Sequence, residues 1–279
     1  MLPILRSVAA LRQQVAAWRK DGLRIAFIPT MGALHEGHLS LVKAGLKEAD
    51  RVLVSIFVNP TQFGPNEDFS AYPRTEPADA AKLEGAGAHA VFAPSVEEMY
   101  PEGASTTVTV SRVSEGLCGA FRPGHFAGVA TVVTKLLNQA QPDIALFGEK
   151  DYQQLQVIRR LVTDLDIPVA IRGVPTLREA DGLAMSSRNA YLSPRERAIA
   201  PALHRTLQEV AAKLRAGAAS AEAAKEGIDA ILAAGFSSVD YLELRAADDL
   251  TPMLAFDRPA RLIVAARLGK ARLIDNIPV

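Results

Sequence analysis

Residues 29–38 read PTMGALHEGH and separate two runs of different pattern. The residues before them, 25–28, form a short apolar run that predicts a β-strand. The residues after them, 39–49, have the apolar spacing of a helix. Glycines between the two runs permit a tight turn. A strand, a turn and a helix in this order predict the first unit of an α/β fold with parallel strands.

The alternation of strands and helices continues through the first two-thirds of the chain. The apolar run 52–58 predicts a strand that is buried on both faces. Later segments predict strands at 90–93, 144–147 and 169–172, and helices at 78–84, 127–139 and 152–165. We therefore expect a doubly wound parallel sheet.

The pattern changes after Arg188. Alanine-rich segments predict helices at residues 194–215 and 221–233, and strands are expected at 239–244, 262–266 and 272–275. These elements predict a smaller C-terminal α+β domain. We place the boundary where a polar loop begins, which gives a first domain of residues 1–176 and a second of residues 177–279.

The composition argues against several classes of function. The chain has 31 Lys and Arg residues and 31 Asp and Glu residues, so its formal net charge is zero. Nucleic-acid binding rewards dense positive charge, and a neutral chain without a basic run is a poor candidate for it. No apolar run approaches the roughly 20 residues that span a bilayer. We expect neither a nucleic-acid partner nor a membrane.

The N-terminus and the single cysteine indicate a cytoplasmic protein. The first residues lack a basic segment followed by an apolar one, so no signal peptide is expected. The one cysteine, Cys118, cannot form an intramolecular disulfide, which fits a reducing compartment. A lone cysteine could be a nucleophile, but a small buried apolar residue is its more common role.

Two histidines, His35 and His38, stand in the turn after the first strand. Ligands of doubly wound sheets bind outside the carboxyl ends of strands, where this turn is expected to lie. The helix expected beyond His38 would present free N–H groups and a positive dipole end to a phosphate. Two alternatives stay open, namely histidines satisfied within the turn and a zinc site. Zinc is disfavoured because zincins space their histidines four residues apart and no third ligand is evident.

A second strand end carries a glycine, a lysine and an acid before a helix. Gly148 lets the backbone turn beneath a ligand, and Lys150 supplies a positive charge suited to an ATP phosphate. Asp151 is a candidate N-cap of the helix, and Gln154 lies one turn beyond it, so its amide faces the same edge of the sheet. The alternative for Lys150 is an ordinary surface lysine.

Two further segments carry polar side chains suited to a ligand. Ser186, Ser187 and Arg188 form a hydroxyl and guanidinium cluster at the domain junction, which suits the β- and γ-phosphates of a nucleotide. Asn59 and Gln62 follow the buried strand, and their amides can read hydroxyls or a carboxylate. Ordinary loop and turn chemistry is the alternative for both segments.

Taken together, these segments resemble the pantothenate synthetase family. His35 to His38 read as the H-x-G-H signature of the nucleotidylyltransferase superfamily, and Met185 to Asn189 resemble its K-M-S-K-S loop. The stretches similar to the family run from about residue 25 to 193 and read PTMGALHEGH, SIFVNPTQFG, YPRT, RPGHFAGVATVVTKLL, GEKDYQQL and ADGLAMSSRN. The C-terminal part matches only in character.

The resemblance implies a fold, a reaction and an assembly. The implied fold is a Rossmann-like nucleotide-binding domain with a small C-terminal lid, usually in a homodimer. The implied reaction is the condensation of pantoate with β-alanine, which consumes ATP with Mg²⁺. It would run through an acyl-adenylate and release AMP and pyrophosphate.

The resemblance also implies roles for particular residues. His38 would be a proton donor, and His35 and Lys150 would assist it at the phosphates. Gln62 and Gln154 would hold pantoate, beside Asn59, and Gln62 would also face β-alanine. Leu177 stands where the family more often has valine, and a backbone contact to adenine tolerates the change. The metal has no assigned protein ligand. The implied ATP site consists of Met31, Gly32, Ala33, Leu34, His35, Glu36, Gly37, His38, Gly148, Glu149, Lys150, Asp151, Leu177, Met185, Ser186, Ser187 and Arg188.

Three other functions fit parts of this pattern. A nucleotidylyltransferase would stop after nucleotide transfer to another acceptor. An aminoacyl-tRNA synthetase is disfavoured because the chain has neither an evident tRNA-binding extension nor net positive charge. A non-catalytic nucleotide-binding regulator is disfavoured because Lys150 and both histidines are intact.

Overall fold

The computed structural model describes residues 2–65, 67 and 69–279. Within these residues, six parallel strands form one sheet in the order β1-β4-β3-β2-β5-β6, and three antiparallel strands form a second. The strands of the parallel sheet are β1 (Ile4–Leu5), β2 (Ile25–Thr30), β3 (Arg51–Ile56), β4 (Ala90–Phe92), β5 (Ile144–Gly148) and β6 (Ala170–Val174). The α/β fold with a parallel sheet and a smaller second sheet confirms the predicted fold class.

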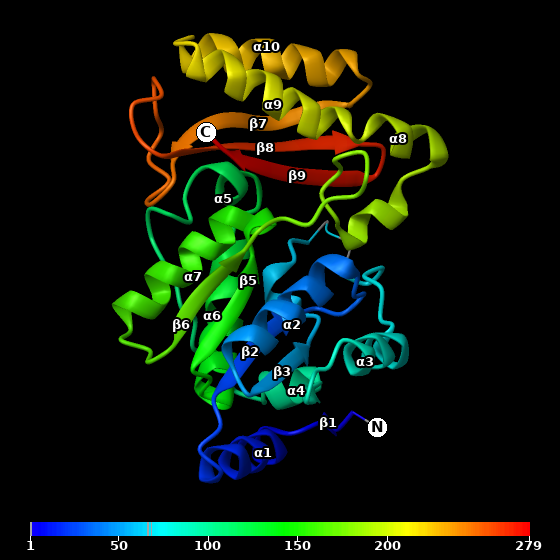
Figure 1. The fold of residues 1–279 in the computed structure, drawn as a ribbon, viewed down its shortest axis with the longest axis vertical. Coiled ribbons are helices and arrows are strands. Elements are labelled where there is room, and N and C mark those ends of the chain that lie inside the picture. The colour runs from blue at the N-terminus through cyan, green and yellow to red at the C-terminus, as the bar shows by residue number, and fades with distance from the viewer. Residues whose placement is uncertain (1, 66, 68) are drawn as a thin grey trace.

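Helices cover both faces of the parallel sheet (Figure 1). They are α1 (Val8–Lys20), α2 (Glu36–Glu48), α3 (Glu76–Gly85), α4 (Val96–Met99), α5 (Leu117–Phe121), α6 (His125–Ala140) and α7 (Tyr152–Asp164). Successive residues of β2 alternate between two cores. Phe27 packs with α1, α6 and α7, whereas Ile28 packs with α2 and α3. Burial on both faces explains why the central strands are almost wholly apolar.

The second sheet consists of β7 (Ser238–Ala246), β8 (Ala260–Leu268) and β9 (Ala271–Pro278). Helices α9 (Ala202–Arg215) and α10 (Ser220–Ala233) cover its outer face, away from the parallel sheet (Figure 1). Along β8, Leu262 and Val264 pack towards these helices, whereas Ile263 and Ala265 join the core of the first domain. The small sheet is therefore buried on both faces. The boundary after Thr176 stays a prediction.

One predicted helix was wrong in extent. Residues 194–215 form two helices, α8 (Pro194–Ile199) and α9, rather than one. Pro201 lies between them, and its ring has no N–H to donate to the carbonyl four residues earlier. No helix in the described part of the chain is both long enough and apolar enough to cross a bilayer.

Candidate active site

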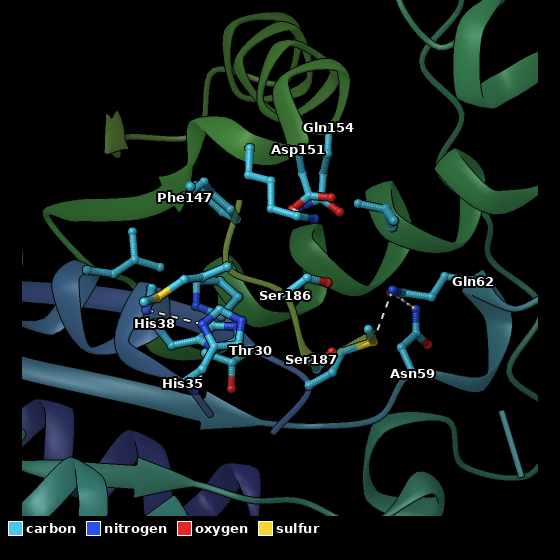
Figure 2. A pocket seen from close by; sticks show the side chains of 18 of the residues that line it. Thr30, His35, His38, Asn59, Gln62, Phe147, Asp151, Gln154, Ser186 and Ser187 are labelled. Atoms are coloured by element: carbon cyan, nitrogen blue, oxygen red, sulfur yellow. Dashed lines mark hydrogen bonds and ion pairs between the residues drawn. The ribbon is translucent and has the colours of Figure 1, made fainter. Parts of the chain in front are cut away.

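A cavity of about 230 Å³ opens beside the carboxyl ends of β2 and β5. Five segments that are far apart in the sequence line it, and Figure 2 labels side chains from four of them around one space. The structure thus brings together most of the residues that the sequence singled out. Those that line the cavity are Met31, His35, Gly37, His38, Asn59, Gln62, Gly148, Lys150, Asp151, Gln154, Leu177, Met185, Ser186, Ser187 and Arg188.

The remaining predicted residues do not line this cavity. They are Gly32, Ala33, Leu34, Glu36 and Glu149. Leu34 and Glu36 border a second hollow on another side of His35. The carboxylate of Glu149 instead accepts a hydrogen bond from Arg261, 2.8 Å away in the C-terminal domain.

Side chains of α3 form hydrogen bonds with the turn that precedes the histidines. Gly32 and Ala33 both have positive φ, +83° and +50°, which turns their backbone sharply. The buried carboxylate of Asp79 accepts the N–H groups of Ala33 and Leu34 at 2.9 and 2.8 Å. Lys82 donates to the carbonyl of Leu34 at 2.6 Å. Neither Asp79 nor Lys82 was singled out from the sequence, because they lie more than 40 residues from the turn.

Helix α2 begins earlier than the sequence suggested. It starts at Glu36 and not beyond His38, with His35 as its N-cap. The Nδ1 atom of His35 accepts the N–H of Gly37 at 3.1 Å, and Nδ1 of His38 accepts the N–H of His35 at 3.4 Å. A backbone N–H can only donate, so both Nδ1 atoms are unprotonated. Each neutral ring therefore carries its proton on Nε2.

Burial keeps both histidines neutral. Burial, helped by the charge of Lys150, lowers the pKa of His35 to about 4. Burial, helped by the electrostatic effect of the neighbouring His35, lowers the pKa of His38 to about 3. At neutral pH each ring can offer an Nε2–H hydrogen bond but no ionic charge.

Lys150 lies in the short 3₁₀ helix η2 (Glu149–Asp151) between β5 and α7. Its side chain is 19% exposed, and its Nζ atom lies 3.7 Å from the carboxylate of Asp151. Asp151 occupies the N-cap position of α7, as the sequence suggested, but its side chain makes no capping hydrogen bond. The carboxylate instead faces the cavity beside Lys150 (Figure 2).

Gln62 lies in the 3₁₀ helix η1 (Pro60–Gln62), and its amide is fixed by neighbours. Its Nε2 donates to the sulfur of Met31 at 3.1 Å, and its Oε1 accepts from Asn59 Nδ2 at 3.0 Å. Asn59 is only 1% exposed and also accepts from Tyr100 at 2.9 Å. In this structure Asn59 therefore positions Gln62. Gly128 makes this possible, because a Cβ there would lie 2.3 Å from the carbonyl oxygen of Thr61.

Arg122 and His125 also line the cavity, although neither was singled out from the sequence. Arg122 makes a bidentate pair with Glu67, with both distances 2.6 Å. His125 donates from Nδ1 to the carbonyl of Gln62 and accepts from Arg122 at Nε2, each at 2.9 Å. Burial, with the charge of Arg122, lowers the pKa of His125 to about 4. The sequence feature that could have identified them is RPGH. It stands directly before an apolar helical segment and resembles the first histidine turn.

The loop before α8 closes the cavity on the side of the C-terminal domain. Met185 donates its N–H to the carbonyl of Leu177 at 3.0 Å, which joins the two ends of this loop. Ser186 caps the 3₁₀ helix η3 (Ser187–Tyr191) by accepting the N–H of Arg188 at 3.3 Å. Ser186 and Ser187 lie between the histidines and Gln62 in Figure 2. Hydroxyl and guanidinium groups are thus held opposite the first turn.

Cys118 lies outside the cavity. It is buried, as expected, but its neighbours are polar. Its sulfur lies 3.1 Å from the hydroxyl of Tyr241 and accepts from Arg272 at 3.3 Å. These contacts join α5 to the second sheet.

The fold and the cavity define an α/β protein suited to a phosphorylated ligand. Neutral imidazoles, a lysine and a serine–arginine loop converge at the carboxyl edge of a parallel sheet, the usual ligand-binding edge of such sheets. Comparison with known proteins narrows this class to one family. A sequence model of the family described as pantoate-beta-alanine ligase matches residues 3–278, so the chain belongs to that family of enzymes.

Relatives and solved structures agree with this assignment. The chain is 68% identical over 276 residues to the pantothenate synthetase of Paramagnetospirillum magneticum, covering 99% of this chain and 97% of that protein. It superposes on pantothenate synthetase from Thermus thermophilus with TM-score 0.91, 48% identity and 99% coverage of both chains. It also superposes on the pantoate-beta-alanine ligase of Francisella tularensis, complexed with beta-gamma ATP and beta-alanine. That match has TM-score 0.84, 35% identity and coverage of 99% of this chain and 97% of the other.

Proposed function

We propose that this chain condenses pantoate with β-alanine at the expense of ATP, through a pantoyl-adenylate, and releases AMP and pyrophosphate. The observation that carries the proposal is the composition of one cavity. Phosphate-type donors and the amides of Asn59, Gln62 and Gln154 line the same space, and the family membership names the substrates. We also propose the predicted homodimer, cytoplasmic location and domain boundary, which rest on the resemblance and on the sequence.

The histidines, Lys150 and the loop of Ser187 and Arg188 supply hydrogen bonds and positive charge to the site. The Nε2–H groups of His35 and His38, together with Lys150, would contact the triphosphate. Ser187 and Arg188 would contact its outer phosphates from the facing loop. A bound triphosphate adds negative charge, which raises the pKa of a nearby histidine. The hydrogen bond that His38 donates from Nε2 strengthens as negative charge grows on the phosphate.

Other residues of the same cavity suit pantoate, which carries a carboxylate, two hydroxyls and two methyl groups. The amides of Gln62 and Gln154 would bind the polar groups. An apolar wall from α6, formed by Val129, Val132 and Val133, would receive the methyl groups. Gln62 also faces the space where the amine would enter.

In the first step, a carboxylate oxygen of pantoate would form a bond to the α-phosphorus of ATP. The bond from that phosphorus to the bridging oxygen breaks, and pyrophosphate leaves. Negative charge shifts onto the phosphoryl oxygens, where His38 and Lys150 stabilise it. No side chain of the protein needs to become covalently attached.

In the second step, the neutral amine of β-alanine would attack the carbonyl carbon of the adenylate. The bond from that carbon to the phosphate oxygen breaks, AMP leaves, and the amine nitrogen loses a proton. Catalysis here would come mainly from positioning and from excluding water from the reactive adenylate. The fixed amide of Gln62 fits this positioning role.

The residues present fit a magnesium ion that arrives with the nucleotide. Among the described residues, no three His, Cys, Asp or Glu side chains gather into a metal-binding group. Mg²⁺ often needs only one or two carboxylates besides phosphate oxygens, and Asp151 offers one at the cavity. When bound, the ion would offset charge on the phosphates.

Product analysis tests the proposed function. The purified chain is incubated with ATP, Mg²⁺, pantoate and β-alanine, and products are identified by mass. We expect pantothenate, AMP and pyrophosphate in equal amounts, and no pantothenate when any one substrate is left out. Formation of ADP instead of AMP, or no product from the folded chain, would reject the proposal.

A further inference from the structure

We infer that Asn276, in the last strand of the C-terminal sheet, is a positioning residue for Lys150. This inference rests on the proposed function, because it concerns the lysine assigned to the ATP phosphates. The Nδ2 group of Asn276 donates to two consecutive carbonyls, those of Glu149 at 2.8 Å and Lys150 at 3.0 Å. The small domain thus holds the backbone of the lysine itself.

Arg261 fixes the orientation of this amide. Its guanidinium donates to Oδ1 of Asn276 at 3.1 Å, which leaves the NH₂ group to face the two carbonyls. The reversed amide would place its oxygen against two carbonyl oxygens and its NH₂ against a guanidinium. Both ends of the amide therefore select one orientation.

Arg261 also holds the same loop directly. A second nitrogen donates to the carboxylate of Glu149 at 2.8 Å, and the guanidinium stacks over the ring of Tyr152 at 4.2 Å from its centroid. Glu149, Lys150 and Tyr152 are consecutive or nearly so, and they form the connection from β5 to α7. Asn276 and Arg261 together clamp this connection from the second domain.

Burial makes the clamp costly to break. Asn276 is only 2% exposed, so water cannot easily replace its amide. Removing the NH₂ group leaves two carbonyls of η2 without these donors, and such groups are expensive to leave unpaired. The 3₁₀ helix η2 is a single turn without a side-chain cap hydrogen bond. Loss of the clamp would therefore let the Lys150 backbone move.

The test uses Asn276→Asp and Asn276→Ala in the full chain. Aspartate has the same shape but sets a second acceptor against the carbonyls, whereas alanine removes the side chain. We expect kcat to fall by about 10- to 100-fold, the effect of a displacement near 1 Å. The KM for ATP should change with it, and the KM for pantoate should stay within about twofold, because Lys150 serves the nucleotide.

A double-mutant cycle with Lys150→Ala separates positioning from general damage. If Asn276 acts through the lysine, Asn276→Asp should cost less than about threefold once Lys150 is already gone. The same fold-loss in both backgrounds would overturn the inference. If the aspartate variant does not fold, the cycle is run with Asn276→Ala.

Leu273→Ala is the matched control on the same strand. Leu273 is 4% exposed and packs towards α9, away from η2. We expect this variant to lower the melting temperature while kcat stays near that of the unaltered chain. An equal loss of kcat in Leu273→Ala, or folded Asn276 variants with unchanged kinetics, would contradict the clamp. Failure of the proposed function would look different, since the unaltered chain itself would then make no product.

Discussion

The backbone N–H of His35 donates to Nδ1 of His38 over 3.4 Å, and the two ring centroids lie 4.1 Å apart. The same His35 ring caps α2 through its own Nδ1. The two histidines are thus linked through backbone donors, and each keeps its Nε2–H for a ligand. Their contributions can be separated by substituting one ring at a time.

His38→Ala should lower turnover more than His35→Asn. Asparagine is a good N-cap and keeps one donor, so His35→Asn retains the start of α2. His38→Ala removes a donor close to the reacting phosphate, a loss of about 10²-fold or more. Steady-state kcat and KM for ATP measure the difference. Equal losses would contradict the larger role assigned to His38.

Metal analysis of the same proteins tests the alternative zinc site. We expect no stoichiometric zinc in the purified chain. Tightly bound zinc that is lost in either histidine variant would restore the metal interpretation.

Lys150→Ala should lower kcat by at least ~10²-fold, the scale for loss of one preorganised donor. The Lys150 side chain is partly exposed, so the variant should remain folded by circular dichroism. Lys43→Ala is the control, because Lys43 is 65% exposed on α2 and its nearest ionic partner, Glu36, is 3.9 Å away. Near-normal turnover in a folded Lys150→Ala variant would make Lys150 a bystander.

Gln154→Ala should raise the KM for pantoate strongly and leave ATP binding almost unchanged. A site that pairs with hydroxyls and a carboxylate loses affinity when its amide is removed. Gln62→Ala should do the same and also weaken the use of β-alanine. Direct ATP binding by calorimetry is the second measurement. A comparable loss of ATP affinity in Gln154→Ala would refute the assignment.

Sequence pattern predicted the sheet and its ligand-binding edge because both depend on local signals. Apolar runs such as 52–58 mark buried strands, and their carboxyl ends necessarily share one edge. The pattern missed β1 and α1, although Leu11, Val15 and Trp18 form a helical stripe in the core. It also ran one helix through Pro201, where the missing N–H required a break.

Contacts between distant segments could not be predicted from the sequence. Asp79 binds a turn 45 and 46 residues away, and nothing local to either segment indicates this. Glu149 adjoins the lysine in sequence, yet its carboxylate points to Arg261, 112 residues further on. Adjacent positions in a short 3₁₀ turn point in different directions, so membership of a motif does not place every side chain in the cavity.

Lowering the pH from 6.5 to 5 should destabilise the folded chain, although carboxylates titrate mainly below this window. His38 and His125 have folded-state pKa values of about 3 and about 4, lowered chiefly by burial. Unfolded histidine titrates near 6.5, so between pH 6.5 and 5 the unfolded chain binds more protons. The free energy of unfolding should therefore fall as pH falls through this window. Urea unfolding at several pH values measures the slope.

His125→Gln provides the control for that slope. Glutamine cannot titrate, so the variant should show a shallower loss of stability between pH 6.5 and 5. Its absolute stability should be lower, because Arg122 and Gln62 lose their imidazole partner. An unchanged slope, or a gain of stability on acidification, would mean that His125 is not buried as a neutral ring.

The last prediction concerns the order of chemical events. If pantoyl-adenylate forms before the amine reacts, the first step is reversible in the absence of β-alanine. Labelled pyrophosphate should then exchange into ATP when pantoate and Mg²⁺ are present. The cavity fits this order, since the groups proposed for phosphate and for pantoate line the same space and no side chain described there is an obvious covalent relay.

Leaving out single substrates and testing two variants make the exchange experiment decisive. A regulator would show no exchange, and a nucleotidylyltransferase with another acceptor would require that acceptor in place of pantoate. Cys118→Ser should exchange normally, because Cys118 lies outside the cavity and would take part only if a thioester carried the acyl group. Lys150→Ala should lose exchange and overall turnover together, since both depend on attack at the α-phosphorus. If exchange appears only after β-alanine is added, the amine enters before the first bond breaks or controls pyrophosphate release, and the two-step route is wrong.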